Sequence, residues 1–307
     1  MRVLVAGGAG FVGHALVRRW LAKPDVEVVV LDAMTYAAWP SVRDVDERRL
    51  QFIEGSIADF DLDGLFAKHR FDRVVNAAVE YLTERTESET SSFIGTNVKG
   101  VERLLAAARR HGNPRFVQLS TDEVYGTVRT GALPPDERAP LDPVTPFAAS
   151  KASADLLGLA CFRSFGQNIV IVRLGALLGP GQPPWQPGGR ALLTALGEST
   201  APKADASTRR TWIDLSTACA AIDAIASRAN AGEIFNVTLG PEASEEELAR
   251  RAAKSQISEV SGVTRYAGNA EKFQSTFPEV RLADFDGSVA ATMSWYRENR
   301  PLWEKLL

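Results

Sequence analysis

A hydroxyl and two adjacent carboxyls stand together in this sequence at Thr121, Asp122 and Glu123. They follow an apolar run, 116–120, that we interpret as the fifth strand of a parallel sheet, and ligands bind beyond the carboxyl ends of such strands. Neighbouring carboxyls can serve as a general acid and a general base when their surroundings separate their pKa values. The segment is therefore a candidate catalytic site, with a solvated turn or a helix cap as the alternative.

A glycine-rich loop, GGAGFVG at 7–13, lies between a predicted strand and a predicted helix. Glycines there permit a tight turn and a close approach to a pyrophosphate, while the helix N-terminus supplies amide donors. Asp32 ends the next strand at about the 20-residue spacing at which an acidic side chain binds ribose hydroxyls. We predict a nicotinamide dinucleotide site, with a plain glycine turn as the alternative. Because Asp32 would repel a 2′-phosphate and neither Ala33 nor Met34 is an arginine, NAD is favoured over NADP.

The elements that must position these residues alternate along the chain. Short runs rich in β-branched residues alternate with amphipathic stretches, which is typical of parallel strands joined by helices. The predicted strands are 3–6, 26–31, 51–53, 73–77, 116–120, 169–174 and 233–237. The predicted helices include 11–22, 93–110, 147–165, 216–228 and 285–298. The expected fold class is α/β, a Rossmann-type doubly wound parallel sheet of about seven strands with a smaller C-terminal substrate lobe.

Two domains are expected. The dinucleotide-binding domain comprises 1–176 and 208–239, and the smaller lobe comprises 177–207 and 240–307. The segment 177–207 is rich in Gly and Pro, which favours a mobile segment on the substrate side.

Composition excludes several other classes of protein. A net charge of -3 over 307 residues provides no basic field for nucleic acid. No leader precedes Val3, and no apolar run approaches the roughly 18–20 residues that span a bilayer, so we expect a cytoplasmic protein with no membrane partner. His14, His69 and His111 lack metal-ligand spacing with one another or with a cysteine, so no metal is expected.

Together, these segments resemble the NAD-dependent nucleotide-sugar epimerase/dehydratase family of extended short-chain dehydrogenase/reductases. The similarity extends over nearly the whole chain and includes 31–36, 76–80, 96–100 and 232–237. The triplet at 121–123 is the most specific segment, because it resembles the motif of dTDP-glucose 4,6-dehydratases, whereas simple 4-epimerases usually lack the carboxyl pair.

The resemblance implies a reaction and roles for particular residues. In such dehydratases NAD oxidises the sugar at C4, the C5 proton is removed, the C6 hydroxyl leaves, and the hydride returns to C6. Glu123 would be the C5 base, Asp122 the acid for the leaving hydroxyl, and Thr121 the hydrogen-bond partner of the C4 oxygen. Arg210 matches the arginine that binds the substrate diphosphate, whereas Arg209 is expected to be a solvated surface charge.

The resemblance also implies the residues around cofactor and sugar. Those implied to bind NAD are Gly7, Gly10, Phe11, Val12, Gly13, Asp32, Ala77, Ala78 and Lys151. Glu80 and Tyr81 follow the fourth strand and are implied to reach the sugar of a nucleotide-diphosphate sugar, with a packed Tyr81 as the alternative. The resemblance further implies a cleft between the lobes for the sugar and a homodimer paired through the helices 93–110 and 147–165.

The sequence departs from the family at the position of the catalytic tyrosine, four residues before Lys151. Phe147 stands there and cannot accept a proton; Ala176 and Ser56 replace an Asn and an Asp that are common in relatives. Four explanations stay open: a neighbouring Asp replaces the tyrosine as the base, the tyrosine was exchanged to trap a substrate, the enzyme performs other sugar chemistry such as 4-epimerisation, or the protein binds NAD and nucleotide sugar without turnover.

Overall fold

The computed structural model describes residues 1–39, 48–81, 90–129, 131–199, 202–255 and 264–306. The chain divides into two compact units, the first formed by 1–124, 143–172 and 222–234 and the second by 125–142, 173–221 and 235–307. This division places 125–142, 173–176, 208–221 and 235–239 in the second unit, whereas the sequence assigns them to the dinucleotide-binding domain. The functional assignment of the two predicted domains stays a prediction.

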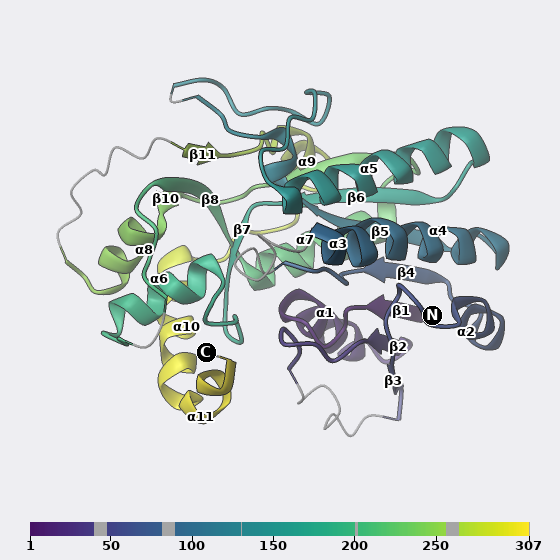
Figure 1. Cartoon of the computed structure of the whole chain (residues 1–307), viewed down its shortest axis with the longest axis horizontal. Coiled ribbons are helices and arrows are strands. Elements are labelled where there is room, and N and C mark those ends of the chain that lie inside the picture. The colour runs from purple at the N-terminus through teal and green to yellow at the C-terminus, as the bar shows by residue number, and fades with distance from the viewer. Residues whose placement is uncertain (40–47, 82–89, 130, 200–201, 256–263, 307) are drawn as a thin grey trace. The chain divides into compact units, whose positions relative to one another are not determined.

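Seven strands of the described chain form one sheet in the order β3-β2-β1-β4-β5-β6-β9 (Figure 1). They are β1 (Arg2–Ala6), β2 (Glu27–Asp32), β3 (Leu50–Glu54), β4 (Arg73–Asn76), β5 (Arg115–Thr121), β6 (Ile169–Leu174) and β9 (Ile234–Val237). β1 pairs in parallel with β2 and β4, and the β2–β3 and β4–β5 pairs are also parallel. The strand order reverses between β1 and β4, so their carboxyl ends form the switch point at which such sheets bind ligands. The predicted Rossmann-type sheet is confirmed.

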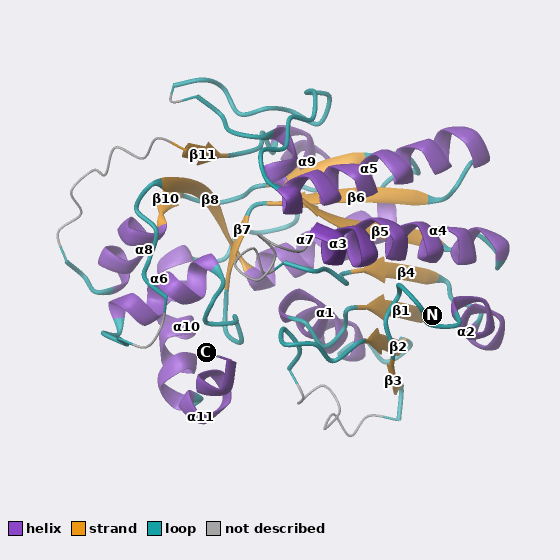
Figure 2. Ribbon diagram, viewed as in Figure 1, coloured by secondary structure: helices purple, strands orange, loops and turns teal. Residues whose placement is uncertain are grey.

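Helices lie in most of the connections between these strands, as is usual for parallel pairing (Figure 2). They are α1 (Phe11–Leu21), α2 (Leu62–His69), α3 (Thr90–Phe93), α4 (Val101–Arg110), α5 (Pro146–Phe165) and α7 (Leu215–Arg228). Leu4 of β1 and Leu31 of β2 belong to one buried core. Phe66 of α2, Leu104 of α4 and Ala154 of α5 belong to the same core. This core packs α2, α4 and α5 against the sheet.

The predicted continuous helix over 93–110 is wrong in one respect. Between α3 and α4, Ile94–Gly100 forms a wider π-helical turn. Asn97, inside that turn, directs its side-chain amide to the backbone of Glu80 and to Ser150, contacts that a local helical pattern does not encode. Such π-helical segments frequently occur at functional sites.

The second unit contains a small sheet with helices around it. β8 (Thr208–Asp214) pairs antiparallel with β10 (Glu242–Ser244) and parallel with both β11 (Thr264–Tyr266) and β7 (Ala176–Leu178). The helices are α6 (Pro187–Ala195), α8 (Glu245–Ala252), α9 (Glu271–Thr276), α10 (Phe285–Glu298) and α11 (Arg300–Trp303). The Gly- and Pro-rich segment 177–207 therefore contains the regular helix α6. None of the helices in the described ranges is long and apolar enough to cross a membrane.

Candidate active site

The glycine loop joins β1 to α1, and two of its glycines are required by close backbone contacts. Gly7 has φ +77°, and a Cβ there would lie 2.4 Å from the Ala78 amide nitrogen. A Cβ on Gly13 would lie 2.0 Å from the Gly7 carbonyl oxygen. Gly10 differs, because its nearest neighbour would be the Gly7 oxygen at 3.4 Å, an ordinary contact. The fold therefore tolerates a side chain at position 10. That side chain would, however, obstruct a ligand that approaches the start of α1.

The start of α1 fits a dinucleotide phosphate. Gly10 is the N-cap of α1 and has no side chain to accept hydrogen bonds from the first turn. The amides of Phe11, Val12 and Gly13 lie in that turn, where backbone N–H groups lack acceptors within the helix. Asp32, at the end of β2, accepts hydrogen bonds from the Ala9 and Met34 amides, each at 2.8 Å. Burial raises the pKa of Asp32, and these two hydrogen bonds oppose that shift. Amide donors for a pyrophosphate and a fixed carboxylate for a ribose diol are the groups that NAD requires.

Behind this loop, the residues after β4 are held by Asn97. Its Oδ1 accepts from the Glu80 amide at 2.8 Å, and its Nδ2 donates to the Glu80 carbonyl at 2.9 Å. The Glu80 carboxylate accepts from the Tyr36 hydroxyl and, at 3.2 Å, from the Tyr81 amide. The predicted cofactor residue Ala78 and the predicted sugar residues Glu80 and Tyr81 therefore belong to one fixed segment that begins beside Gly7.

Thr121, Asp122 and Glu123 lie at the carboxyl end of β5. The strand ends at Thr121, and Asp122–Tyr125 form a single 3₁₀ turn, which the Thr121 hydroxyl caps by accepting from the Glu123 amide at 3.2 Å. Asp122 is only 3% exposed and Glu123 only 9%. The solvated-turn alternative is therefore wrong, because buried carboxyls require a specific reason for their burial.

Phe147 and Lys151 lie one turn apart on α5 and are both buried. The helix begins at Pro146, and the Thr145 hydroxyl caps it by accepting from the Ala148 amide at 3.1 Å. The Lys151 ammonium donates to the Leu119 carbonyl of β5 at 2.7 Å. Burial lowers the pKa of Lys151 to about 8, and the Asp155 carboxylate opposes that shift. The ammonium is thus held beside the strand that leads to Thr121.

Sequence reasoning missed Asn97 and Ser150 as site residues. Asn97 Nδ2 donates to Ser150 Oγ at 2.9 Å, and Ser150 Oγ donates to the Phe147 carbonyl at 2.7 Å. This chain of hydrogen bonds joins the segment after β4 to the first turns of α5. The signal was present, since 96–100 resembled a family segment and Asn is disfavoured inside a helix unless its side chain has a partner.

In the second unit, the neighbours Arg209 and Arg210 of β8 have different surroundings. The Arg210 guanidinium lies over the Tyr266 ring, 5.0 Å from its centroid. One Arg209 nitrogen contacts both carboxylate oxygens of Glu247, at 2.7 and 2.6 Å. The expectation that Arg209 is a solvated charge is therefore wrong. Glu247 also closes the capping box of α8 with Ser244, so Arg209 stabilises the start of that helix.

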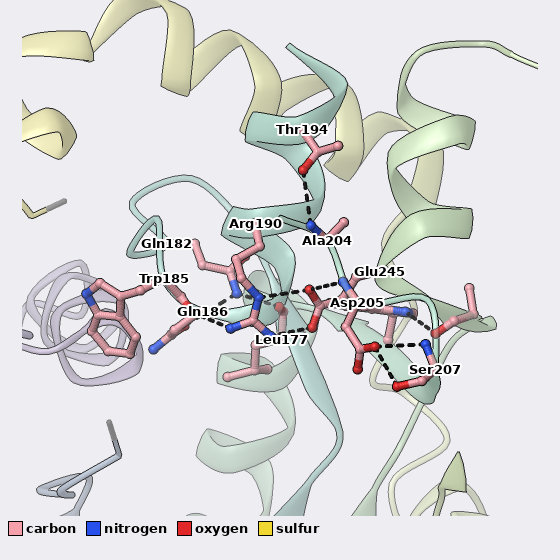
Figure 3. Close-up of polar contacts among 12 residues, drawn as sticks. Leu177, Gln182, Trp185, Gln186, Arg190, Thr194, Ala204, Asp205, Ser207 and Glu245 are labelled. Atoms are coloured by element: carbon pink, nitrogen blue, oxygen red, sulfur yellow. Dashed lines mark hydrogen bonds and ion pairs between the residues drawn. The ribbon is translucent and has the colours of Figure 1, made fainter. Parts of the chain in front are cut away.

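A buried ion pair organises the region around α6. Arg190 makes two parallel hydrogen bonds to Glu245, at 2.9 and 2.5 Å, and the Asp205 amide donates to the same carboxylate at 3.0 Å. Figure 3 shows the Glu245 carboxylate between Arg190 and Asp205, so the pair joins α6, α8 and the segment before β8. The Gln182 side-chain amide donates to the Leu177 carbonyl at 2.8 Å. The arrangement fixes the described residues 177–199 and 202–207 rather than presenting a reactive group.

No metal centre forms among the residues that the structure describes, since they contain no group of three or more His, Cys, Asp or Glu side chains that could hold an ion.

The model of the family described as "NAD dependent epimerase/dehydratase family" matches residues 3–238. The chain is 35% identical to the dTDP-glucose 4,6-dehydratase of Streptomyces niveus, over 100% of this chain and 96% of that protein.

Solved structures are similar over the same range. The dTDP-glucose 4,6-dehydratase from Streptomyces venezuelae, solved with NAD and TYD bound, has a TM-score of 0.88 and 35% identity, with 100% of both chains covered. The UDP-glucose 4-epimerase of Thermus thermophilus, solved with NAD, has a TM-score of 0.84, 24% identity and coverage of 97% of this chain and 100% of its own. The second likeness concerns the fold alone.

Proposed function

Because the chain belongs to the NAD-dependent epimerase/dehydratase family, we propose that it dehydrates a nucleotide-diphosphate hexose to a 4-keto-6-deoxy sugar. NAD is the cofactor of this family. The observation that carries the proposal is the buried pair Asp122 and Glu123, which follows β5 at the ligand-binding edge of the sheet. Simple epimerisation at C4 needs no second acid and base, whereas removal of water across C5 and C6 needs both.

The proposed chemistry uses the turn after β5. The glycine loop and Asp32 would hold NAD, which would supply the acceptor for the hydride that leaves C4 of the sugar. Glu123 takes the C5 proton, which is acidic beside a C4 ketone, and Asp122 protonates the departing C6 hydroxyl. Thr121 Oγ1 lies 3.5 Å from Asp122 Oδ1, long for a hydrogen bond between oxygens, so its proton can turn to the C4 oxygen.

Lys151 and Arg210 have binding roles in this proposal. Lys151 binds the cofactor and places a buried positive charge beside the site of C4 oxidation. Arg210 binds the substrate diphosphate, to which a planar guanidinium can donate two parallel hydrogen bonds. Glu80 and Tyr81 face the sugar in this scheme. We also propose that the protein acts in the cytoplasm as a homodimer.

Incubation with NAD and a panel of dTDP-, UDP- and GDP-hexoses tests the proposal. The expected product is a 4-keto-6-deoxy sugar, detected by mass spectrometry as the loss of one water. A 4-epimer without loss of water would replace the proposal by epimerisation. Binding of NAD and nucleotide sugar without any product would favour a non-catalytic protein, the interpretation that Phe147 supports.

A further inference from the structure

We propose that Tyr81 accepts the proton of the sugar C4 hydroxyl, the role that Phe147 has no oxygen to perform. The inference rests on the proposed function. In the step, the C4–H bond breaks as hydride leaves for NAD, and the C4 hydroxyl loses its proton to the Tyr81 phenolate. A C4=O bond and a phenol O–H form, and the phenol later releases that proton to solvent.

The position of the Tyr81 ring carries the inference. Tyr81 packs edge-on against Phe147, with ring centroids 4.9 Å apart and an interplanar angle of 76°. Phe93 is the other aromatic ring that the described residues place against Phe147, at 6.3 Å. Only Tyr81 of these two neighbours bears a hydroxyl. A phenol from the end of β4 therefore lies next to the α5 position where a phenol is missing.

The backbone around Tyr81 is fixed relative to Phe147. The Tyr81 amide donates to the Glu80 carboxylate at 3.2 Å, and Asn97 holds the Glu80 backbone through both of its polar groups. Asn97 also donates to the Ser150 hydroxyl, which in turn donates to the Phe147 carbonyl. Proton transfer requires an acceptor held within hydrogen-bond reach of the alcohol, and this network supplies such positioning.

Charged groups of both signs belong to this network, since the Glu80 carboxylate accepts from the Tyr81 amide and a buried lysine follows Phe147 on α5. Lys151 lies four residues after Phe147, hence on the same face of α5. Its ammonium is buried, with a hydrogen bond to the Leu119 carbonyl. A positive charge favours the ionised form of a phenol, whose unperturbed pKa is about 10, whereas a neighbouring carboxylate disfavours it.

The test is Tyr81→Phe, which keeps the ring and its packing on Phe147 but removes the oxygen. Transient NADH formation from the substrate identified in the panel should slow by about 10²- to 10⁴-fold, the usual contribution of a positioned general base. Binding of NAD, measured by calorimetry, should be unchanged. The wild-type rate should rise with pH through the ionisation of the phenol, and this dependence should be absent in Tyr81→Phe.

Two further variants distinguish a proton acceptor from a packing residue. Tyr81→Phe combined with Phe147→Tyr should regain the rate of Phe147→Tyr alone, because the second phenol replaces the first. Tyr36→Phe is the matched control, since it removes the phenol oxygen that donates to Glu80, and it should retain the alkaline rise in rate.

The two possible failures have different signatures. A wild-type protein that forms neither NADH nor product with any sugar of the panel overturns the proposed function. Turnover that survives Tyr81→Phe with its pH dependence intact overturns only the role of Tyr81. If Asp122→Asn lost C4 oxidation while Tyr81→Phe kept the wild-type rate of C4 oxidation, Asp122 would be the proton acceptor.

Discussion

Asp122 and Glu123 occupy one 3₁₀ turn, yet the proposed reaction requires Asp122 to donate a proton and Glu123 to accept one. We expect Glu123→Gln to abolish deuterium incorporation at C5 from heavy water, because an amide cannot accept the C5 proton. Asp122→Asn should instead slow the loss of the C6 hydroxyl while C4 oxidation continues. Mass spectrometry of the sugar and transient NADH absorbance separate these steps. Equal effects of both variants on NADH formation alone would show that neither has its assigned role.

Gly10 and Gly13 allow the cofactor site to be tested separately from the fold. Gly10→Ala adds a methyl group that the loop accommodates, with its nearest atom at 3.4 Å. We expect a folded protein whose NAD affinity falls by at least about tenfold, roughly 1.4 kcal/mol, because the added methyl obstructs the approach of the pyrophosphate. Gly13→Ala, with a contact of 2.0 Å to the Gly7 oxygen, should lower the thermal midpoint instead. Unchanged NAD affinity in Gly10→Ala would contradict a pyrophosphate at this helix N-terminus.

At the scale of elements, α1 and α7 are joined through the Asp223 carboxylate. It accepts from Lys23 at 2.8 and 2.7 Å and from the Trp20 indole at 2.9 Å. Burial raises the pKa of Asp223, but the hydrogen bonds from Lys23 and Trp20 outweigh it, so the pKa lies below its usual value. The buried Arg73 guanidinium lies 3.8 Å away and depends on the same negative charge.

Asp223→Asn should therefore cost about 3 kcal/mol of unfolding free energy at neutral pH, because it leaves the buried Arg73 guanidinium without its carboxylate. A carboxyl whose pKa is depressed by folding contributes stability above its unfolded pKa, and that contribution is lost as pH falls through the folded value. The difference between wild type and variant should thus be constant above about pH 5 and shrink in more acid solution. Urea titrations at several pH values measure it, and a difference independent of pH would contradict the assigned charge.

At the scale of the whole molecule, the exposed apolar side chains of α5 bear on assembly. Leu156 is 58% exposed and Phe165 59%, and Arg109 of α4 lies over the Phe165 ring at 4.6 Å. Both apolar side chains lie on α5, and the proposed dimer would bury exposed apolar surface of this helix. We expect light scattering at micromolar concentration to give a dimer of the 33.3 kDa chain and Leu156→Arg to give the monomer.

Leu133→Arg is the matched control, because Leu133 is 89% exposed in a segment outside these helices. It should remain dimeric. A monomeric wild type, or an equal effect of both substitutions, would contradict pairing through α4 and α5.

The dinucleotide loop, the alternating strands and helices, and the grouping of Thr121 with two carboxyls could be predicted from the sequence alone, because each is encoded within one strand-turn-helix stretch. Tertiary structure decided the burial of Asp122 and Glu123, and the π-helical turn in which Asn97 reaches Glu80. It also decided the contact of Tyr81 with Phe147, which lie on different elements far apart in the sequence. No local periodicity encodes such pairs, since they depend on how strands and helices distant in the sequence pack against one another.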